Sequence, residues 1–416
     1  MVYVKAAKRP TRVRGLHKDV FTNIGGVVGN SEEFGADKIL IEDQYGRLMS
    51  RTEIESWLNK GVSVGAPVGN KILIKSEKPT TDNSPFTVGS EDSGSGLFTD
   101  TSVASVGAIG AKVKVAVTGS SLSQIATTNA TEKLEISLYD GKANKEIAAS
   151  DTEVTFYKVA QSEYADYCVD DLGTMYNETG ATDTAKTNSA YDKTVNAYGL
   201  KQDGTKVKLL PSQLEVRALN DAKVDVTNNV ISDKTAGAGY LEKDFLDSLG
   251  KKITKTVKIE VGIKDGKSGA IVKTITKDLI LSTEAPKVAS IGLSGVTDGE
   301  ANINNSSTGA LAFGDLLKFI NMNEVKDQYG VSVKNSGSYL YNSGNPAGPV
   351  MTITDISDKS FEQSADEADK DFIVDSNKSG SANIAGAHDG DMFTVTYSYD
   401  GVSQKVVFTV VGNPTA

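Results

Sequence analysis

The strongest constraint on the fold comes from two long segments in which apolar and polar residues alternate on both sides of a short turn. Residues 256–281 read "TVKIEVGIKDGKSGAIVKTITKDLIL", and residues 391–411 read "DMFTVTYSYDGVSQKVVFTVV". A period of two places every second side chain on the same face, which is the pattern of a half-buried β-hairpin. Asp400-Gly401 is a dipeptide favoured in tight type I′ turns. Each segment therefore predicts a hairpin.

A related pattern in the first third predicts a third strand pair, and with it three modules. The segments "AKVKVAVTG" (111–119) and "EKLEISLYDG" (132–141) both alternate and are joined by a longer polar loop. A chain of 416 residues is too long for one core, and modules of about 130–140 residues have the usual domain size. If each strand pair closes a module, the boundaries fall at 1–145, 146–284 and 285–416. The "STEAP" sequence at 282–286 is the second linker.

The predicted fold class is all-β, with tandem immunoglobulin-like β-sandwich modules and a few short helices. Strands with one apolar face and another rich in Thr, Ser and Lys are typical of such sandwiches, although a barrel fits the same pattern. Residues 50–61 predict the best helix, because Ser50 and Glu53 are spaced as a capping box. Residues 240–250 predict another, with shorter helical pieces expected at 163–176 and 314–321.

The charge distribution argues against a nucleic-acid partner for the body of the protein. The formal net charge is −10, although six basic residues precede the first acidic residue, Asp19, in an N-terminal arm. The remainder is thus more acidic than the total, and such a surface repels phosphate backbones. The sequence contains no run of about 18 apolar residues, so it predicts no helix that crosses a membrane. Cys168 is the only cysteine, so the chain can form no internal disulfide.

The tetrapeptide Asp-Gln-Tyr-Gly occurs twice, at 43–46 and at 327–330. Asp can bond to its own backbone two residues on, and Gly can take a positive φ, so the motif predicts a chain reversal between strands. A ligand site for a metal or a sugar is the alternative interpretation. Both copies follow a Phe-Gly pair, Phe34-Gly35 and Phe313-Gly314, which favours a common ancestor. In the middle third, residues 200–210 offer only a faint counterpart.

With "EDQYGRLM" and "KDQYGVSV" between strands, the acidic and nearly Cys-free chain resembles the immunoglobulin-like modules of surface-layer proteins from Bacillus-type Gram-positive bacteria. The resemblance covers the first and third modules through these motifs and the middle module only by architecture. It implies secretion, a cell-surface location and self-assembly into a two-dimensional lattice, often with calcium. Family members also carry a secretion signal and wall-binding modules. Neither is visible here, so we expect this chain to be the assembly part alone, attached to the cell wall through a region outside it.

The sequence gives little support to an enzymatic function. His17 and His388 are the only histidines, and neither lies near a motif. We find no nucleophile–base pair and no cofactor motif, so we predict no catalytic site. Calcium is the one predicted cofactor, because Ca²⁺ needs several carboxylate and carbonyl oxygens. The candidate ligands are Asp366, Asp369 and Asp371 in one acidic stretch, and Asp166, Asp170 and Asp171 in another. A solvated acidic loop is the alternative for each.

The leading functional hypothesis is therefore a structural protein of the cell surface that self-assembles with its own copies, assisted by calcium. The alternative is an extracellular adhesin, or a phage-surface binding module, that recognises a glycan or a protein. Ordered sheets of purified chain would favour the first hypothesis. Dispersed particles that bind a glycan would favour the second.

Overall fold

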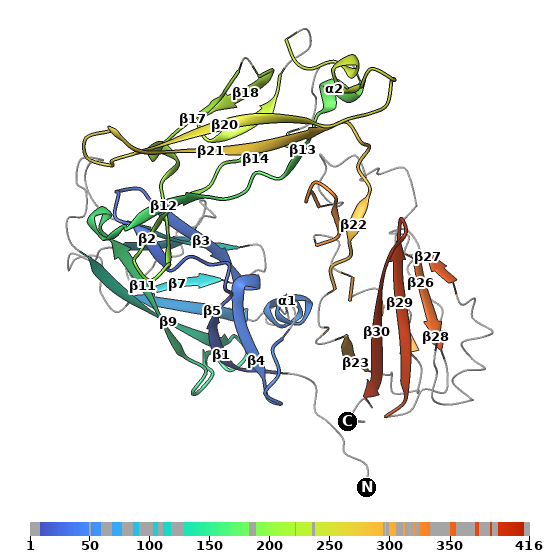
Figure 1. The fold of residues 1–416 in the computed structure, drawn as a ribbon. Coiled ribbons are helices and arrows are strands. Elements are labelled where there is room, and N and C mark those ends of the chain that lie inside the picture. The colour runs from blue at the N-terminus through green and yellow to red at the C-terminus, as the bar shows by residue number, and fades with distance from the viewer. Residues whose placement is uncertain are drawn as a thin grey trace. The chain divides into compact units, whose positions relative to one another are not determined.

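The computed structural model is built mainly of β-strands and divides into two compact units, Arg9–Glu284 and Ala285–Ala416 (Figure 1). Within the first unit the buried apolar residues form two clusters, and a further cluster belongs to the second unit. The β-dominated sandwich class predicted from the alternating segments is confirmed. The structure describes the chain apart from residues 1–8, 50, 60–68, 77–85, 91–102, 107–110, 118–128, 183–188, 221, 235–237, 294–295, 297–298, 305–310, 313–315, 317–318, 321–323, 333–349, 355–370, 374–382, 385–389 and 412–416.

The first core lies between two sheets at the start of the unit Arg9–Glu284. The main sheet has the order β2 (Asn23–Gly25), β11 (Thr152–Val159), β9 (Ala130–Asp140), β5 (Lys71–Ser76) and β7 (Val103–Val106), and β10 (Lys145–Glu146) pairs with β9. The facing layer contains β3 (Ser31–Gly35), β8 (Lys112–Val117) and β6 (Phe86–Ser90), together with the pair β1 (Pro10–Leu16) and β4 (Ile39–Asp43). Phe34 of β3 stacks on Phe156 of β11 with ring centroids 6.2 Å apart, so the two layers meet through their aromatic side chains.

The second core repeats this arrangement with fewer strands. Its main sheet has the order β13 (Thr174–Tyr176), β21 (Ile271–Ser282), β20 (Lys255–Lys264) and β17 (Leu214–Ala218). A smaller sheet contains β14 (Lys193–Thr194), β19 (Val230–Asp233) and β18 (Val224–Thr227). Ile231 of β19 and Ile259 of β20 belong to one buried cluster, as expected for two sheets that share a core.

The unit Ala285–Ala416 has the same kind of main sheet. The order is β23 (Glu300–Asn304), β30 (Val402–Val411), β29 (Met392–Tyr399), β26 (Val350–Thr354) and β27 (Asp371–Ile373). Two short pairs accompany it, β22 (Val288–Ser290) with β25 (Lys326–Asp327) and β24 (Leu311–Ala312) with β28 (Asn383–Ile384). In all three main sheets the first strand pairs in parallel with the last strand. The last strand also pairs antiparallel with another long strand of its sheet: β11 with β9, β21 with β20, and β30 with β29.

Two of the three predicted strand pairs are confirmed, and the first is wrong. β20 pairs with β21, and β29 pairs with β30 through Asp400 and Gly401, whose φ values of 49° and 84° suit a type I′ turn. In the first third, however, β8 pairs with β3 and β6, whereas β9 pairs with β5 and β11. The two alternating segments thus lie in opposite layers. β11 completes the first main sheet beyond residue 145, and the limits of the three modules remain a prediction.

A continuous sheet joins the first two cores. β12 (Asp166–Val169), β15 (Ala197–Leu200) and β16 (Lys206–Lys208) extend the first main sheet beyond β2, through a parallel contact of Lys208 with Ile24. The Asn30 side chain donates to the carbonyl oxygens of Gly25, at 3.1 Å, and of Lys208, at 2.8 Å. The Lys208 ammonium also pairs with the buried Glu32 carboxylate. The two cores are therefore bonded together.

The helices in the structure match the helices predicted from the sequence only in part. α1 (Arg51–Asn59) forms where predicted and buries Ile54 and Leu58, although the capping residue Ser50 lies outside the described residues. Residues 240–250 instead contain a single 3₁₀ turn, Glu242–Phe245, and Leu249 is 91% exposed. Residues 163–176 hold β12 and β13 rather than a helix, and most of 314–321 lies outside the described residues. The second α-helix, α2 (Glu178–Thr182), covers five residues.

Candidate functional site

The two Asp-Gln-Tyr-Gly segments form the same hydrogen-bonded turn. In the first copy, one carboxylate oxygen of Asp43 accepts the backbone N–H groups of Tyr45, at 2.8 Å, and of Arg47, at 3.1 Å. In the second, the Asp327 carboxylate accepts those of Tyr329 and Val331, both at 2.9 Å. The glycines have φ values of 78° and 81°, which a residue with a Cβ rarely adopts. The structural interpretation of the motif is confirmed.

The middle core has its own copy of this turn, which the sequence analysis missed. Asp247 accepts the backbone N–H groups of Leu249 and Lys251, both at 2.8 Å, and Gly250 has a φ of 76°. A bridge between the residues just before and after the turn recurs as well: Glu42 with Leu48, Leu246 with Lys252, and Lys326 with Ser332. The shared signal is Asp-x-x-Gly. In this copy Ser248 and Leu249 replace the Gln and Tyr of the other two.

The counterpart predicted at residues 200–210 is a different turn. Lys201 occupies the position that Asp holds elsewhere, and its N–H donates to the Thr205 carbonyl oxygen at 3.0 Å. The nearby Asp203 carboxylate accepts the N–H of Thr205 at 2.9 Å. Because a lysine side chain cannot accept the turn's N–H groups, this segment lacks the bond that defines the other three copies.

The glutamine of the motif holds the chain where it enters the module. The Gln44 N–H donates to the Arg9 carbonyl at 3.1 Å, and its side-chain oxygen accepts the Arg9 N–H at 2.5 Å. Gln328 makes the same two bonds with Lys287, at 3.2 and 2.6 Å, and its side-chain nitrogen donates to the Ala285 carbonyl at 2.9 Å. Arg9 and Lys287 each directly precede the first strand of their sandwich. We call this pair of contacts the glutamine clamp.

The three aspartates of the first predicted calcium cluster each lie beside a lysine. Asp166 pairs with Lys273 at 2.9 Å, Asp170 with Lys206 at 2.9 Å, and Asp171 with Lys277 at 2.6 Å. Asp170 also accepts the hydroxyl of Tyr198 at 2.8 Å. The hydrogen bonds from Lys273 and Lys277 lower the pKa values of Asp166 and Asp171. These carboxylates therefore connect β12 and its flanking residues to β16 and β21.

The second predicted calcium cluster lies largely beyond the described part of the chain. Asp366 and Asp369 are outside it, and Asp371 begins β27, where only the backbone is described. Among the residues that the structure describes, no group of three His, Cys, Asp or Glu side chains could hold a metal ion. The predicted calcium ligands thus remain a prediction.

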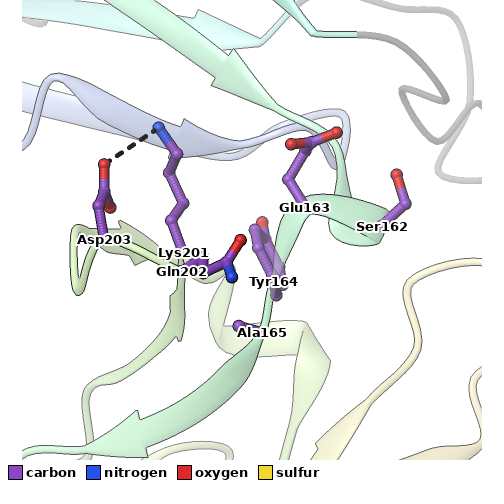
Figure 2. Close-up of a pocket in the computed structure, with 7 residues that line it drawn as sticks. All are labelled: Ser162, Glu163, Tyr164, Ala165, Lys201, Gln202 and Asp203. Atoms are coloured by element: carbon purple, nitrogen blue, oxygen red, sulfur yellow. Dashed lines mark ion pairs between the residues drawn. The ribbon is translucent and has the colours of Figure 1, made fainter.

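A polar pocket lies beside the extension of the first main sheet (Figure 2). Figure 2 shows Lys201 and Asp203 facing each other, with nitrogen and oxygen 3.9 Å apart, on one side of Tyr164. Burial raises the pKa of Tyr164, and an added Cβ at Gly199 would lie 2.6 Å from its ring. The Tyr164 ring therefore packs on bare backbone. The remaining lining residues are Ser162, Glu163, Ala165 and Gln202.

The two histidines add no catalytic grouping to the described structure. His17 lies 3.1 Å from the exposed Asp19 carboxylate, and His388 falls outside the described residues. Among the described helices, none is both long enough and apolar enough to span a bilayer.

Comparisons with known proteins yield structural likenesses only. No family model matches the chain, and no curated protein does either. Domains 4–9 of the surface layer protein SbsC match at 15% identity and a TM-score of 0.27, covering 98% of this chain and 51% of that one. Domains 5–6 of SbsC match at 15% identity and a TM-score of 0.27, and the match covers 65% of this chain and 98% of that one. The BSP domain of a biofilm-associated protein matches at 10% identity and a TM-score of 0.19, and the match covers 99% of this chain and 69% of that one.

These values do not assign the chain to a family. It spans about half of the length of the SbsC domain 4–9 structure that it matches. Every TM-score above is below 0.5, so the sandwich fold follows from the chain's own sheets alone, and the Bacillus-type assignment remains an expectation.

Proposed function

We propose that this chain is the module array of a structural protein at a cell surface and that its copies assemble into a two-dimensional lattice. The observation that carries the proposal is repetition within one chain. In each of the three main sheets the first and last strands pair in parallel, and three Asp-x-x-Gly turns share one set of hydrogen bonds. Such repetition is typical of a protein that presents similar surfaces at regular intervals.

The continuous sheet between the first two cores supports the proposal. A lattice needs fixed angles between neighbouring contact surfaces, and flexible linkers would allow those angles to vary. Here the junction contains the bonds of Asn30, the Lys208–Glu32 pair, and a 3.0 Å bond from the Gly266 N–H to the Gln161 side chain. These contacts hold the two sandwiches of Arg9–Glu284 in one orientation.

The exposed faces of the main sheets also suit contact with other copies. Cross-strand ion pairs lie on them, including Lys133 with Glu153, and Lys258 with Asp278, at 3.0 and 2.9 Å. All four of these side chains are about half exposed. Such neighbouring positive and negative side chains can pair with opposite charges on a second copy, which favours specific over indiscriminate association.

Calcium and a cell-wall attachment complete the proposal. The formal net charge of −10 makes copies repel one another, and divalent cations shared between carboxylates would reduce this repulsion. The arm that contains Lys5, Lys8 and Arg9 offers a second means, by contact with an acidic neighbour. The bacterial cell wall is the further partner that this proposal includes.

Sedimentation velocity of the purified chain tests self-association directly. We expect large species to grow with protein concentration in millimolar calcium and to shrink when calcium is chelated. A chain that stays monomeric at every concentration but binds a glycan array would contradict the proposal and support a binding module instead. Association that is equal in calcium and in chelator would show that calcium is not needed, and the proposal of self-assembly would stand without it.

A further inference from the structure

The first and last strands of each main sheet form a parallel contact, which we call the terminal joint. In the first sandwich β2 lies beside the end of β11, with Tyr157, Lys158 and Val159 opposite residues 23–25. In the second, β13 lies beside residues 280–282 of β21. In the third, the five residues of β23 lie beside residues 407–411 of β30. The chain thus enters and leaves every main sheet through neighbouring strands that run in the same direction.

Equivalent hydrogen bonds define the beginning of all three joints. A backbone N–H of the last strand donates to the carbonyl just before the first strand. These bonds are Tyr157 to Thr22 at 2.8 Å, Ile280 to Gly173 at 3.0 Å, and Val407 to Gly299 at 2.9 Å. The far ends of the first two joints match as well, where Gly26 donates to Val159 at 2.9 Å and Asn177 to Ser282 at 2.8 Å.

This geometry determines how a sandwich responds to tension along the chain. Because the two strands are parallel, the incoming chain meets the joint at one end, and the outgoing chain leaves it at the other. Pulling the two ends apart slides the strands past each other, so the evenly spaced bonds of a parallel pair are strained together. An antiparallel terminal pair would be pulled open from one end, one bond at a time.

We infer that the terminal joints make each sandwich resist tension between its ends, so that the chain functions as a mechanical link. The inference rests on the proposed structural function for its use in the cell, since a surface array attached at one side transmits force through its modules. The behaviour of the joint under force does not depend on assembly and can be measured on a single chain. If the chain forms no lattice, the resistance of the joints to force can still be measured. If the joints do not resist force, the lattice proposal is not affected.

The glutamine clamp places a second set of bonds on the same path. Gln328 holds Lys287 and Ala285, which precede β22, before the chain reaches β23 and its joint. Gln44 holds Arg9 ahead of β1 in the same way. Tension on the incoming chain therefore reaches the clamp first, then the antiparallel pairs β1–β4 and β22–β25, and the terminal joint afterwards.

The test stretches the full chain, held at its two ends, in optical tweezers. Val407→Pro removes the N–H that bonds to Gly299, which points toward β23 rather than β29. The control, Val395→Ala, weakens the same core through a fully buried β29 residue and leaves the joint intact. Urea unfolding without force ranks the two variants by their loss of stability.

At constant force we compare the rate at which the third sandwich unfolds in the two variants, corrected for the difference in their stabilities in urea. We expect this rate to be at least about fivefold higher in Val407→Pro than in Val395→Ala. Equal acceleration of that event in the two variants would overturn the inference. If Val407→Pro does not fold, Ile280→Pro takes its place in the second sandwich, because Ile280 is 37% exposed and its N–H bonds to Gly173. Its control is Val257→Ala, at a buried position of β20.

Discussion

At the scale of single residues, the aspartate of the repeated turn has the most specific role. Asp43 is 2% exposed, and one of its carboxylate oxygens accepts two backbone N–H groups. In the equivalent turn at Asp247 the side chain is only partly buried, so water can replace some of the lost bonding there. The same turn should therefore contribute unequally to the stability of different modules.

Asp43→Ala should lower the free energy of unfolding by about 1–3 kcal/mol, because two backbone donors lose their acceptor at a buried site. Asp43→Asn is the matched control, since its amide oxygen can accept the same two bonds. Asp247→Ala should cost less. Urea denaturation measures all three variants. Similar losses for Asp43→Ala and Asp43→Asn would show that the paired hydrogen bonds are not the source of the stability.

Asp166 and Asp171 supply a prediction about pH. Their pKa values are lowered by the hydrogen bonds from Lys273 and Lys277, so the stability from these pairs is present above the ordinary pKa of aspartate. It should be lost as the pH falls through the lowered values of the folded chain. In Lys277→Met, the pKa of Asp171 should rise toward the ordinary value. Carbon-detected NMR titration measures this shift, and an unchanged Asp171 titration would refute the pairing.

At the scale of the element, the glutamine clamp fixes where a strand begins. In Gln328→Ala we expect faster hydrogen exchange at Lys287 and faster proteolysis around residues 283–286, because Lys287 loses the acceptor of its N–H. Gln202→Ala is a suitable control, since that residue lies in an unrelated turn. Exchange at Lys287 that stays as slow as in the unchanged chain would show that β22 is held by other contacts.

Local patterns in the sequence were enough to predict the elements whose partners are adjacent in the chain. The hairpins at 256–281 and 391–411 follow from period-two alternation and turn residues, and the helix at 51–59 from its apolar face. Alternation cannot show which distant strand lies opposite. For this reason β8 and β9 were paired wrongly, and the parallel terminal joints were not foreseen.

The candidate site was predictable to a similar extent. Asp-Gln-Tyr-Gly correctly predicted a turn, but its glutamine contacts residues more than thirty positions away, which turn chemistry does not reveal. The copy at Asp247 was missed because residues 240–250 were predicted to be a helix and because Ser248 and Leu249 replace the Gln and Tyr of the motif. The lysine partners of Asp166 and Asp171 come from β21, more than a hundred residues later.

At the scale of the whole molecule, the shared sheet and buried ion pair should make Arg9–Glu284 unfold as one cooperative unit. Lys208→Met leaves the buried Glu32 carboxylate without its partner and should cost on the order of 2 kcal/mol at the junction. Calorimetry should then show the transition of this unit splitting in two. Lys201→Met, which alters only a surface pair, is the control. A single unbroken transition in Lys208→Met would contradict the coupling.

Negative-stain electron microscopy of the purified chain shows whether its copies assemble into a two-dimensional lattice. The chain is prepared with millimolar calcium and, separately, with a chelator, and the images are examined for a repeating lattice. In calcium we expect extended sheets whose Fourier transforms show sharp two-dimensional reflections, and in chelator smaller or less ordered sheets. Dispersed single particles in both conditions, at concentrations where the chain is folded, would contradict it.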